Sequence, residues 1–186
     1  MQDKPALRRS ALRRRAALSI TERALAGEAL ERALSGVLGR AQRVAAYAAV
    51  GTEPPTEELL AHCTEALLPV LLPDGELDWA AWTAADDLRP GPHGLLEPRG
   101  ERLGVDAIET CDLVLVPALA VDRRGNRLGR GGGSYDRALA RTSALTIALL
   151  YDDELVDELP AEPHDVPVLA VVLPGSGMVP LPLGGR

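Results

Sequence analysis

Residues 112–139 read DLVLVPALAVDRRGNRLGRGGGSYDRAL. The apolar run at residues 113–116 is short enough for a buried strand. A loop with five glycines follows it, and residues 134–140 are typical of the start of a helix. Strand, glycine-rich loop and helix start together form an arrangement that binds phosphate. Glycines let successive backbone N–H groups turn toward one anion, and a helix N-terminus adds partial positive charge. The stretch therefore predicts an anion site.

The loop differs from the two common nucleotide motifs. No Gly-Lys-Ser/Thr follows Gly125 at the spacing of a Walker A loop, and Ser134 stands where GxGxxG requires its third glycine. Arg127 and Arg130 can add full charges and forked hydrogen bonds to an anion. The loop thus predicts an anion rather than a particular nucleotide fold. The alternative is a glycine-rich connection that only permits tight packing.

Composition limits the class of protein. A chain of 186 residues is expected to form one domain, residues 1–186, with a Pro/Gly-rich flexible tail at residues 174–186. The net charge of −7 argues against nucleic-acid binding, although local arginines can still hold a small anion. Cys63 and Cys111 stand alone, as expected in a reducing compartment. No apolar run approaches the roughly 18 residues of a membrane span, and no secretory signal is present, so we expect a cytoplasmic protein.

The N-terminal residues 4–17 predict a basic helix. Its arginines can form a solvated face, supply cations to a phosphate, or act as a nucleic-acid arm, and the residues alone leave these alternatives open. Ser19 and Glu22 form a capping box, which marks the start of a longer amphipathic helix that ends near Gly39.

The middle of the chain predicts alternating strands and helices. A strand at residues 43–49, a helix at 56–67 and a strand at 67–72 favour a parallel sheet with a right-handed crossover. We expect an α/β fold, a single three-layer domain whose mostly parallel central sheet is flanked by helices. Its ligand cleft should lie at the carboxyl ends of the strands. Glu53 falls at that edge, although it can equally be an ordinary loop carboxylate. Trp79 and Trp82 can cover an aromatic ligand or pack in the core.

The segment GNRLGRGGGSYDR at residues 125–137 resembles the signature of the 5-formyltetrahydrofolate cyclo-ligase family. That signature is roughly G-x-R-L-G-x-G-x-G-x-Y-D, preceded by Val-Pro and an Asp, here Val116, Pro117 and Asp122. The resemblance covers residues 4–173. Three positions depart from the pattern: Ser134 replaces the first of two tyrosines, Leu169 an acidic residue, and Leu173 a Thr or Ser.

The resemblance also implies the residues of the site. ATP contacts would fall on Lys4, Arg8, Arg127, Leu128, Gly129, Arg130, Gly131, Gly132, Gly133, Ser134 and Tyr135. Folate contacts would fall on Ala48, Glu53, Arg130, Gly131, Gly132, Gly133 and Ser134. Asp136 and Asp165 match residues that hold Mg²⁺, and Arg130 and Asp136 are expected to be catalytic. From position alone, Asp136 has an alternative role, since an acid in a first helical turn stabilises the helix by about 0.3–1 kcal/mol.

The activity that the resemblance implies is ATP- and Mg²⁺-dependent cyclisation of 5-formyltetrahydrofolate to 5,10-methenyltetrahydrofolate. Phosphorylation of the formyl oxygen would make it a leaving group, with release of ADP and phosphate. Two alternatives are a diverged nucleotide- or folate-binding paralogue without turnover and a kinase of another small acid. We expect a monomer whose partners are ATP and 5-formyltetrahydrofolate, with no nucleic acid and no membrane.

Overall fold

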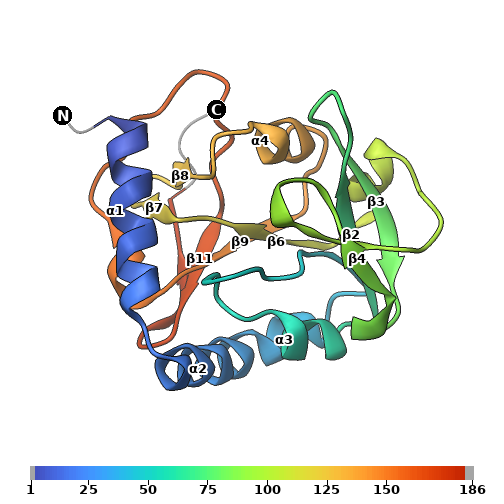
Figure 1. The fold of residues 1–186 in the computed structure, drawn as a ribbon, viewed down its shortest axis with the longest axis horizontal. Coiled ribbons are helices and arrows are strands. Elements are labelled where there is room, and N and C mark those ends of the chain that lie inside the picture. Colours follow the sequence, from blue (N-terminus) through green and yellow to red (C-terminus); the bar gives the residue numbers. More distant parts are fainter. Residues whose placement is uncertain (1–2, 183–186) are drawn as a thin grey trace.

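A seven-stranded sheet runs through the centre of the protein (Figure 1). The structure is a computed structural model, and it describes residues 3–182. Along the sheet the strands follow the order β12 (Gly177–Pro180), β11 (Ala170–Leu173), β9 (Leu145–Leu149), β6 (Leu113–Pro117), β1 (Arg43–Ala45), β2 (Glu65–Leu71) and β3 (Leu77–Trp82). The five strands from β11 to β2 are parallel, and only the outer strands β12 and β3 are antiparallel to their neighbours. The expected mostly parallel α/β sheet is confirmed.

The chain changes direction across the sheet at β1. From β1 it continues to β2 on one side, whereas β6, β9 and β11 are added on the other side. The register places Val44 beside Leu113 and Ala45 beside Val114. The connections that leave the carboxyl ends of β1 and β6 therefore run in opposite directions. Open parallel sheets bind ligands at such a switch point.

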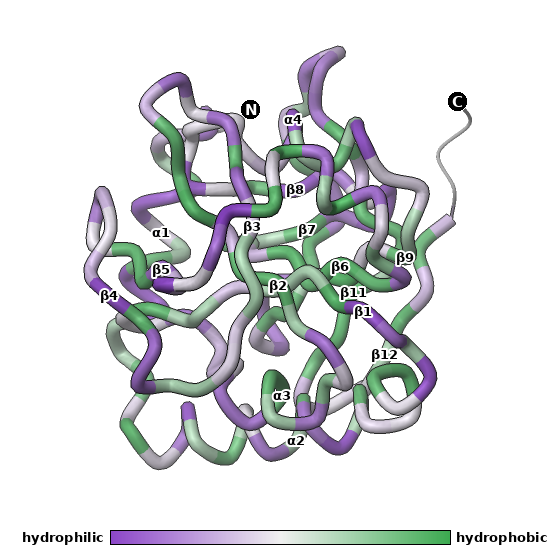
Figure 2. Tube along the Cα trace, turned by 90° about the vertical axis from the view of Figure 1, so that its right-hand side faces the viewer, coloured by the Kyte–Doolittle hydropathy of each residue, from purple (hydrophilic) through white to green (hydrophobic). Residues whose placement is uncertain are grey.

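Both faces of the sheet are buried, as β6 shows by its alternation. Val114 and Val116 join the core on one face, and Leu113 and Leu115 join the core on the other. Helices α2 (Ile20–Leu38) and α3 (Glu57–Ala61) cover the second face, and α4 (Ser134–Leu139) packs on the first. Figure 2 shows the resulting pattern, with hydrophobic strands inside and hydrophilic segments concentrated outside.

The two N-terminal helices start as the sequence predicts. In α1 (Lys4–Ala17), the Asp3 side chain accepts a hydrogen bond from the Ala6 N–H at 2.8 Å. In α2, the capping box of Ser19 and Glu22 is present. Among residues 3–182, none of the helices combines the length and apolar character that a membrane crossing requires.

Smaller elements complete the structure. A three-stranded sheet has the order β10 (Leu155–Val156), β7 (Ala120–Asp122) and β8 (Arg127–Leu128), and a two-stranded sheet joins β4 (Leu88–Pro90) to β5 (Leu96–Pro98). Short 3₁₀ helices lie at Ala85–Asp87, Pro92–Gly94, Val105–Thr110 and Asp152–Glu154. Helix α1 packs on the three-stranded sheet through Ala11, which is buried with Leu119 and Leu128.

Several boundaries predicted from the sequence were wrong. The strand expected at residues 43–49 ends at Ala45, where its pairing with β2 and β6 stops. The helix expected at residues 56–67 ends at Ala61, because β2 already starts at Glu65 and its backbone pairs with β1 and β3. The tail expected to be flexible from residue 174 instead returns as β12, which pairs with β11 from Ala170 to Leu173. The last part of that tail, residues 183–186, lies outside the described residues. Trp79 is fully buried in the core.

Candidate functional site

A cleft of about 460 Å³ opens at the carboxyl ends of β1 and β6. It is lined by α1, the segment after β1, the facing parts of β2 and β3, the end of β6, and the loop that leads into α4. Of the residues predicted for the site, these line the cleft: Lys4, Arg8, Ala48, Glu53, Arg127, Gly129, Arg130, Gly131, Gly132, Gly133, Ser134, Tyr135, Asp136 and Asp165. Residues up to 161 positions apart in the sequence therefore meet in one place.

Leu128 is the exception among the predicted residues. Its side chain is buried against Ala11 and Leu119, away from the cleft lining. Its backbone carbonyl accepts a hydrogen bond from the Leu119 N–H at 2.8 Å. A contact between Leu128 and ATP stays a prediction, and the side chain itself acts in the packing of α1.

The charge of the cleft opposes that of the whole chain. Five basic side chains line it (Lys4, Arg8, Arg15, Arg127 and Arg130), against three carboxylates (Glu53, Asp136 and Asp165). The chain as a whole has a net charge of −7. A cleft with low-dielectric walls and an excess of cations raises the local concentration of anions. This distribution favours an anionic ligand.

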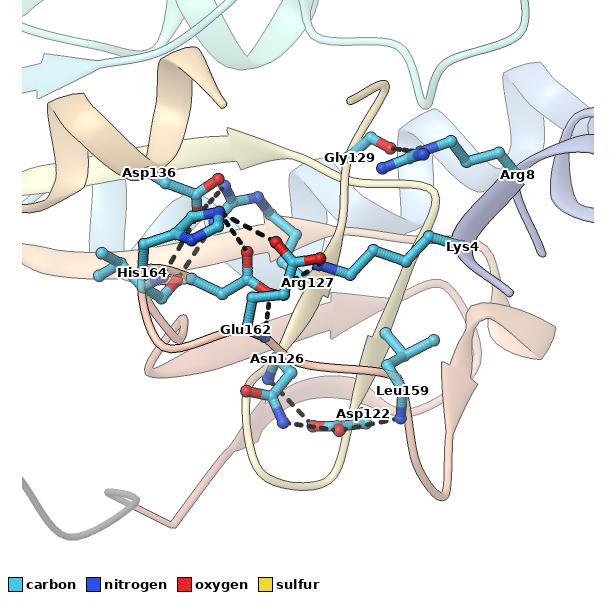
Figure 3. A network of polar contacts seen from close by, with 12 residues as sticks. Lys4, Arg8, Asp122, Asn126, Arg127, Gly129, Asp136, Leu159, Glu162 and His164 are labelled. Carbon is cyan, nitrogen blue, oxygen red and sulfur yellow. Dashed lines mark hydrogen bonds and ion pairs between the residues drawn. The ribbon is translucent and has the colours of Figure 1, made fainter. Parts of the chain in front are cut away.

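The glycine-rich loop brings its backbone close to α1. Gly131 and Gly133 have φ of +105° and +68°, the left-handed region that favours glycine. A β-carbon on Gly131 would lie 3.2 Å from the Arg8 guanidinium carbon. The Arg8 Nε donates a hydrogen bond of 2.8 Å to the carbonyl of Gly129 (Figure 3). Glycine is therefore required where the loop meets an arginine of α1.

Arg137 braces the same loop from the other side. Its guanidinium donates to the carbonyl oxygens of Gly132, at 3.4 Å, and of Gly75. It also forms an ion pair of 3.1 Å with Glu76, which Arg141 contacts at 2.8 Å. The loop is thus tied to the turn between β2 and β3.

Asp122 fixes the hairpin that carries Arg127 into the cleft. Its buried carboxylate accepts hydrogen bonds from the N–H of Arg124 at 2.9 Å and from the N–H and side-chain amide of Asn126 at 3.0 and 2.8 Å. The Leu159 N–H donates to it at 3.1 Å (Figure 3). Four donors on one buried carboxylate hold the turn in one conformation.

The two carboxylates predicted to hold a metal are each paired with a cation. Asp136 Oδ1 lies 3.0 Å from Arg127 Nη2 and accepts a hydrogen bond from the Val166 N–H at 3.2 Å. Asp165 Oδ2 lies 2.8 Å from Lys4 Nζ. Partial burial raises the pKa of Asp165, but the hydrogen bonds from Lys4 and from the Glu162 N–H outweigh that effect and hold the pKa below its ordinary value.

These carboxylates fit a hard divalent cation. Both line the cleft, and carboxylate oxygens are the ligands that Mg²⁺ prefers. Glu162, His164 and Asp165 also have ligand atoms within 4.8 Å of one another. Glu162 and His164 are exposed, so Asp165 is the member of this group that belongs to the cleft.

Glu53 and Arg130 form an ion pair in the cleft. Arg130 Nη2 lies 2.9 Å from Glu53 Oε1, and Glu53 Oε2 accepts a hydrogen bond from the Val50 N–H at 3.0 Å. The arginine side chain is half exposed, while the Glu53 side chain is nearly buried. The glycine-rich loop is therefore linked through Arg130 to the segment that follows β1.

Arg15 lines the cleft, although the sequence left its role open among the three alternatives for the basic helix. It is 2% exposed and donates hydrogen bonds of 2.6 and 2.7 Å to the two carboxylate oxygens of Glu154, which is 1% exposed. Burial by itself lowers the pKa of Arg15. The hydrogen bonds and the charge of Glu154 outweigh that effect and raise the pKa above its ordinary value, so the guanidinium stays charged. The spacing Lys4, Arg8, Ala11, Arg15 follows one helix face and was the available signal.

One wall of the cleft is apolar. It consists of Pro69, Leu71, Leu77, Leu95, Leu96, Pro117, Ala118 and Leu119. No local pattern in the sequence predicts this wall, because its residues come from separate segments that only the fold brings together. The cleft thus has the composition typical of small-molecule sites, an apolar surface with a few placed polar groups.

Comparisons with known proteins identify the family of the chain. A model of the 5-formyltetrahydrofolate cyclo-ligase family matches residues 1–174. The chain belongs to the 5-formyltetrahydrofolate cyclo-ligase family. A 5-formyltetrahydrofolate cyclo-ligase of Mycolicibacterium smegmatis is 42% identical, over 97% of this chain and 98% of that protein.

Solved structures of family members share the fold. The 5,10-methenyltetrahydrofolate synthetase of Aquifex aeolicus superposes with a TM-score of 0.81 at 30% identity, covering 98% of this chain and 95% of that one. A 5,10-methenyltetrahydrofolate synthetase from Mycoplasma pneumoniae gives a TM-score of 0.72 at 23% identity, covering 91% of this chain and 98% of that one. The resemblance inferred from the segment at residues 125–137 is confirmed.

Proposed function

We propose that the protein catalyses the ATP- and Mg²⁺-dependent cyclisation of 5-formyltetrahydrofolate to 5,10-methenyltetrahydrofolate, with release of ADP and phosphate. The observation that carries this proposal is the single cleft in which a cationic glycine-rich loop faces an apolar wall. The loop suits the phosphates of ATP, and the wall suits the planar rings of a folate. Membership of the cyclo-ligase family supports the same reaction.

The chemistry requires a better leaving group than the formyl oxygen. That oxygen attacks the γ-phosphorus of ATP, and the bond from phosphorus to the β–γ bridging oxygen breaks to release ADP. N10 of the folate then forms a bond to the formyl carbon. The carbon–oxygen bond breaks, phosphate leaves with its electron pair, and the N10 proton is lost to solvent. In both steps the main contribution of the protein is to position the two substrates and to neutralise the charge of the phosphates.

Residues of the glycine-rich loop and of α1 would bind ATP. The amides from Gly129 to Gly133 and the side chains of Lys4 and Arg8 would hold the triphosphate, with Arg127, Ser134 and Tyr135 completing the ATP contacts. Leu128 would add at most a backbone contact. Arg130 would act on the transferred phosphoryl group, since its half-exposed guanidinium is free to leave Glu53 and follow the charge.

Glu53 and Ala48 would contact the folate at the end of β1. The Glu53 carboxylate, once Arg130 turns to the phosphates, can accept a hydrogen bond from an N–H of the folate. The loop residues from Arg130 to Ser134 would lie between the two substrates. Phosphoryl donor and formyl oxygen are in this way held next to each other.

Asp136 and Asp165 would hold Mg²⁺ in this site. When bound, the ion would neutralise charge on the phosphate oxygens during transfer. The side chains of Arg127 and Lys4 pair with these two carboxylates, at 3.0 and 2.8 Å, and hold them at the cleft. Asp136 is thereby assigned a catalytic role.

Two alternatives from the sequence, a binding protein without turnover and a kinase of another small acid, have no observation that favours them. A cytoplasmic location and a monomeric state stay predictions. The free thiols Cys63 and Cys111 accord with a reducing compartment.

A spectrophotometric assay tests the proposed function. The purified protein is mixed with 5-formyltetrahydrofolate, Mg²⁺ and ATP, and the near-ultraviolet absorbance of the methenyl product is followed. An increase that requires ATP and Mg²⁺ supports the proposal. ATP binding measured by calorimetry without any absorbance change would contradict it and favour one of the alternatives.

A further inference from the structure

Tyr47 follows the central strand β1 and lines the cleft. Its side chain is only 5% exposed and packs in the core beneath the sheet. Its backbone is fixed, because its carbonyl accepts a hydrogen bond of 2.8 Å from the Thr56 hydroxyl, which in turn accepts one of 2.9 Å from the Ala49 N–H. Thr56 is itself 1% exposed. The ring is therefore held in place before any ligand binds.

The hydroxyl of Tyr47 has no hydrogen-bond partner in the part of the chain that the structure describes, although its oxygen is buried. Burial, and to a smaller extent the nearby carboxylate of Glu53, raise the pKa of Tyr47 well above its ordinary value, so the group stays a neutral O–H donor. Buried polar groups in proteins are nearly always hydrogen-bonded. A fixed donor without a partner at the wall of a binding cleft is suited to a ligand acceptor.

We infer that the Tyr47 hydroxyl is a substrate-binding group that donates a hydrogen bond to an acceptor atom, a carbonyl oxygen or ring nitrogen, of the bound folate. Because it names a contact to the folate, this role rests on the proposed function.

The surroundings of Tyr47 favour the folate over ATP. Its neighbour Ala48 and the Glu53 carboxylate belong to the folate end of the cleft as proposed above. A negative charge there disfavours the phosphates of ATP, whose cationic partners lie on α1 and the glycine-rich loop. A neutral heterocycle meets no such repulsion and can use the apolar wall.

The test compares Tyr47→Phe with the matched variant Tyr151→Phe. Tyr151 is similarly buried, but its hydroxyl donates to the Thr52 carbonyl at 3.4 Å and it does not line the cleft. KM for 5-formyltetrahydrofolate and for ATP is measured for both variants, together with the midpoint of thermal unfolding without ligands. Wild-type turnover in the same assay checks the proposed function separately.

We expect Tyr47→Phe to raise KM for the folate roughly 10-fold, the effect of one lost hydrogen bond to a ligand acceptor, with KM for ATP within twofold of wild type. Its unfolding midpoint should equal or exceed that of wild type, because the change removes a buried hydroxyl without a partner. Tyr151→Phe should leave both KM values unchanged.

Two outcomes would overturn the role of Tyr47 while leaving the reaction intact. One is a Tyr47→Phe enzyme whose KM for the folate stays within twofold of wild type. The other is an equal rise in both KM values together with a lower unfolding midpoint, which would mark the hydroxyl as structural. An inactive wild-type protein would instead overturn the proposed function, and the folate contact with it.

Discussion

Replacing Arg15 with methionine should destabilise the protein strongly. The change removes three hydrogen bonds of 2.6–2.7 Å, two to Glu154 and one to the Ala118 carbonyl, and a guanidinium whose carbon lies 5.5 Å from the centre of the Tyr151 ring. Among the described residues, the 1%-exposed Glu154 carboxylate then keeps a hydrogen bond from the Tyr151 N–H alone. An unpaired buried charge lowers the free energy of unfolding by about 3–5 kcal/mol, or roughly 6–20 °C in the unfolding midpoint for a chain of this size.

Denaturant and thermal unfolding at two pH values measure this effect. Burial raises the pKa of Glu154, and without Arg15 nothing charged opposes that rise. The carboxyl can then take up a proton as the pH falls, so the loss for Arg15→Met should be smaller at pH 5 than at pH 8. The double variant Arg15→Met/Glu154→Leu, which removes both charges, should recover at least about 2 kcal/mol.

Two results would refute this account of the ion pair. A single variant within about 1 kcal/mol of wild type would mean that the pair is solvated. A double variant as unstable as the sum of the two single variants would mean that no coupling exists between the charges.

Four further predictions concern the site, the hairpin turn at Gly125 and the two cysteines. Asp136→Asn keeps an oxygen for its backbone and arginine donors, so we expect a folded protein whose kcat in the absorbance assay falls at least ~100-fold; a wild-type rate would remove it from the site. Lys4→Met should raise KM for ATP roughly 10-fold and KM for the folate less, and the reverse order would contradict the assignment of α1. Gly125→Ala should lower the free energy of unfolding by at least about 1–2 kcal/mol, measured with urea, because φ is +87° and a β-carbon would meet a backbone carbonyl. Burial raises the pKa of Cys63 and of Cys111 to about 11, so alkylation of the native protein should be slow at pH 8 and accelerate toward pH 11; fast reaction at pH 8 would show that the thiols are accessible.

Short sequence motifs correctly predicted the parts of the structure that depend on neighbouring residues in the chain. Glycines at residues 129 and 131–133 mark positions where the backbone turns or approaches another group, and the structure places Arg8 against Gly131. The signature around Asp136 identified the family. The capping box of Ser19 and Glu22 fixed the start of α2 from two side chains three residues apart.

The remaining features depend on contacts that no local pattern contains. Arg15 lies in a basic run that looks solvated, and only the fold provides Glu154, 139 positions away, to bury it. β12 follows a Pro/Gly-rich turn and is a strand because β11 offers an edge to pair with. Tyr47 lies in an ordinary apolar segment just after β1, and only the positions of its neighbours in the fold show that its hydroxyl has no hydrogen-bond partner among residues 3–182.

Phosphorylation of the formyl oxygen in this cleft can be tested by following that oxygen from substrate to product. The protein is given ATP, Mg²⁺ and 5-formyltetrahydrofolate labelled with ¹⁸O in the formyl group, and the released phosphate is examined by mass spectrometry. We predict one ¹⁸O in the phosphate for each methenyl product formed. Methenyl product accompanied by unlabelled phosphate, with the ¹⁸O in water, would show that the formyl oxygen is not phosphorylated.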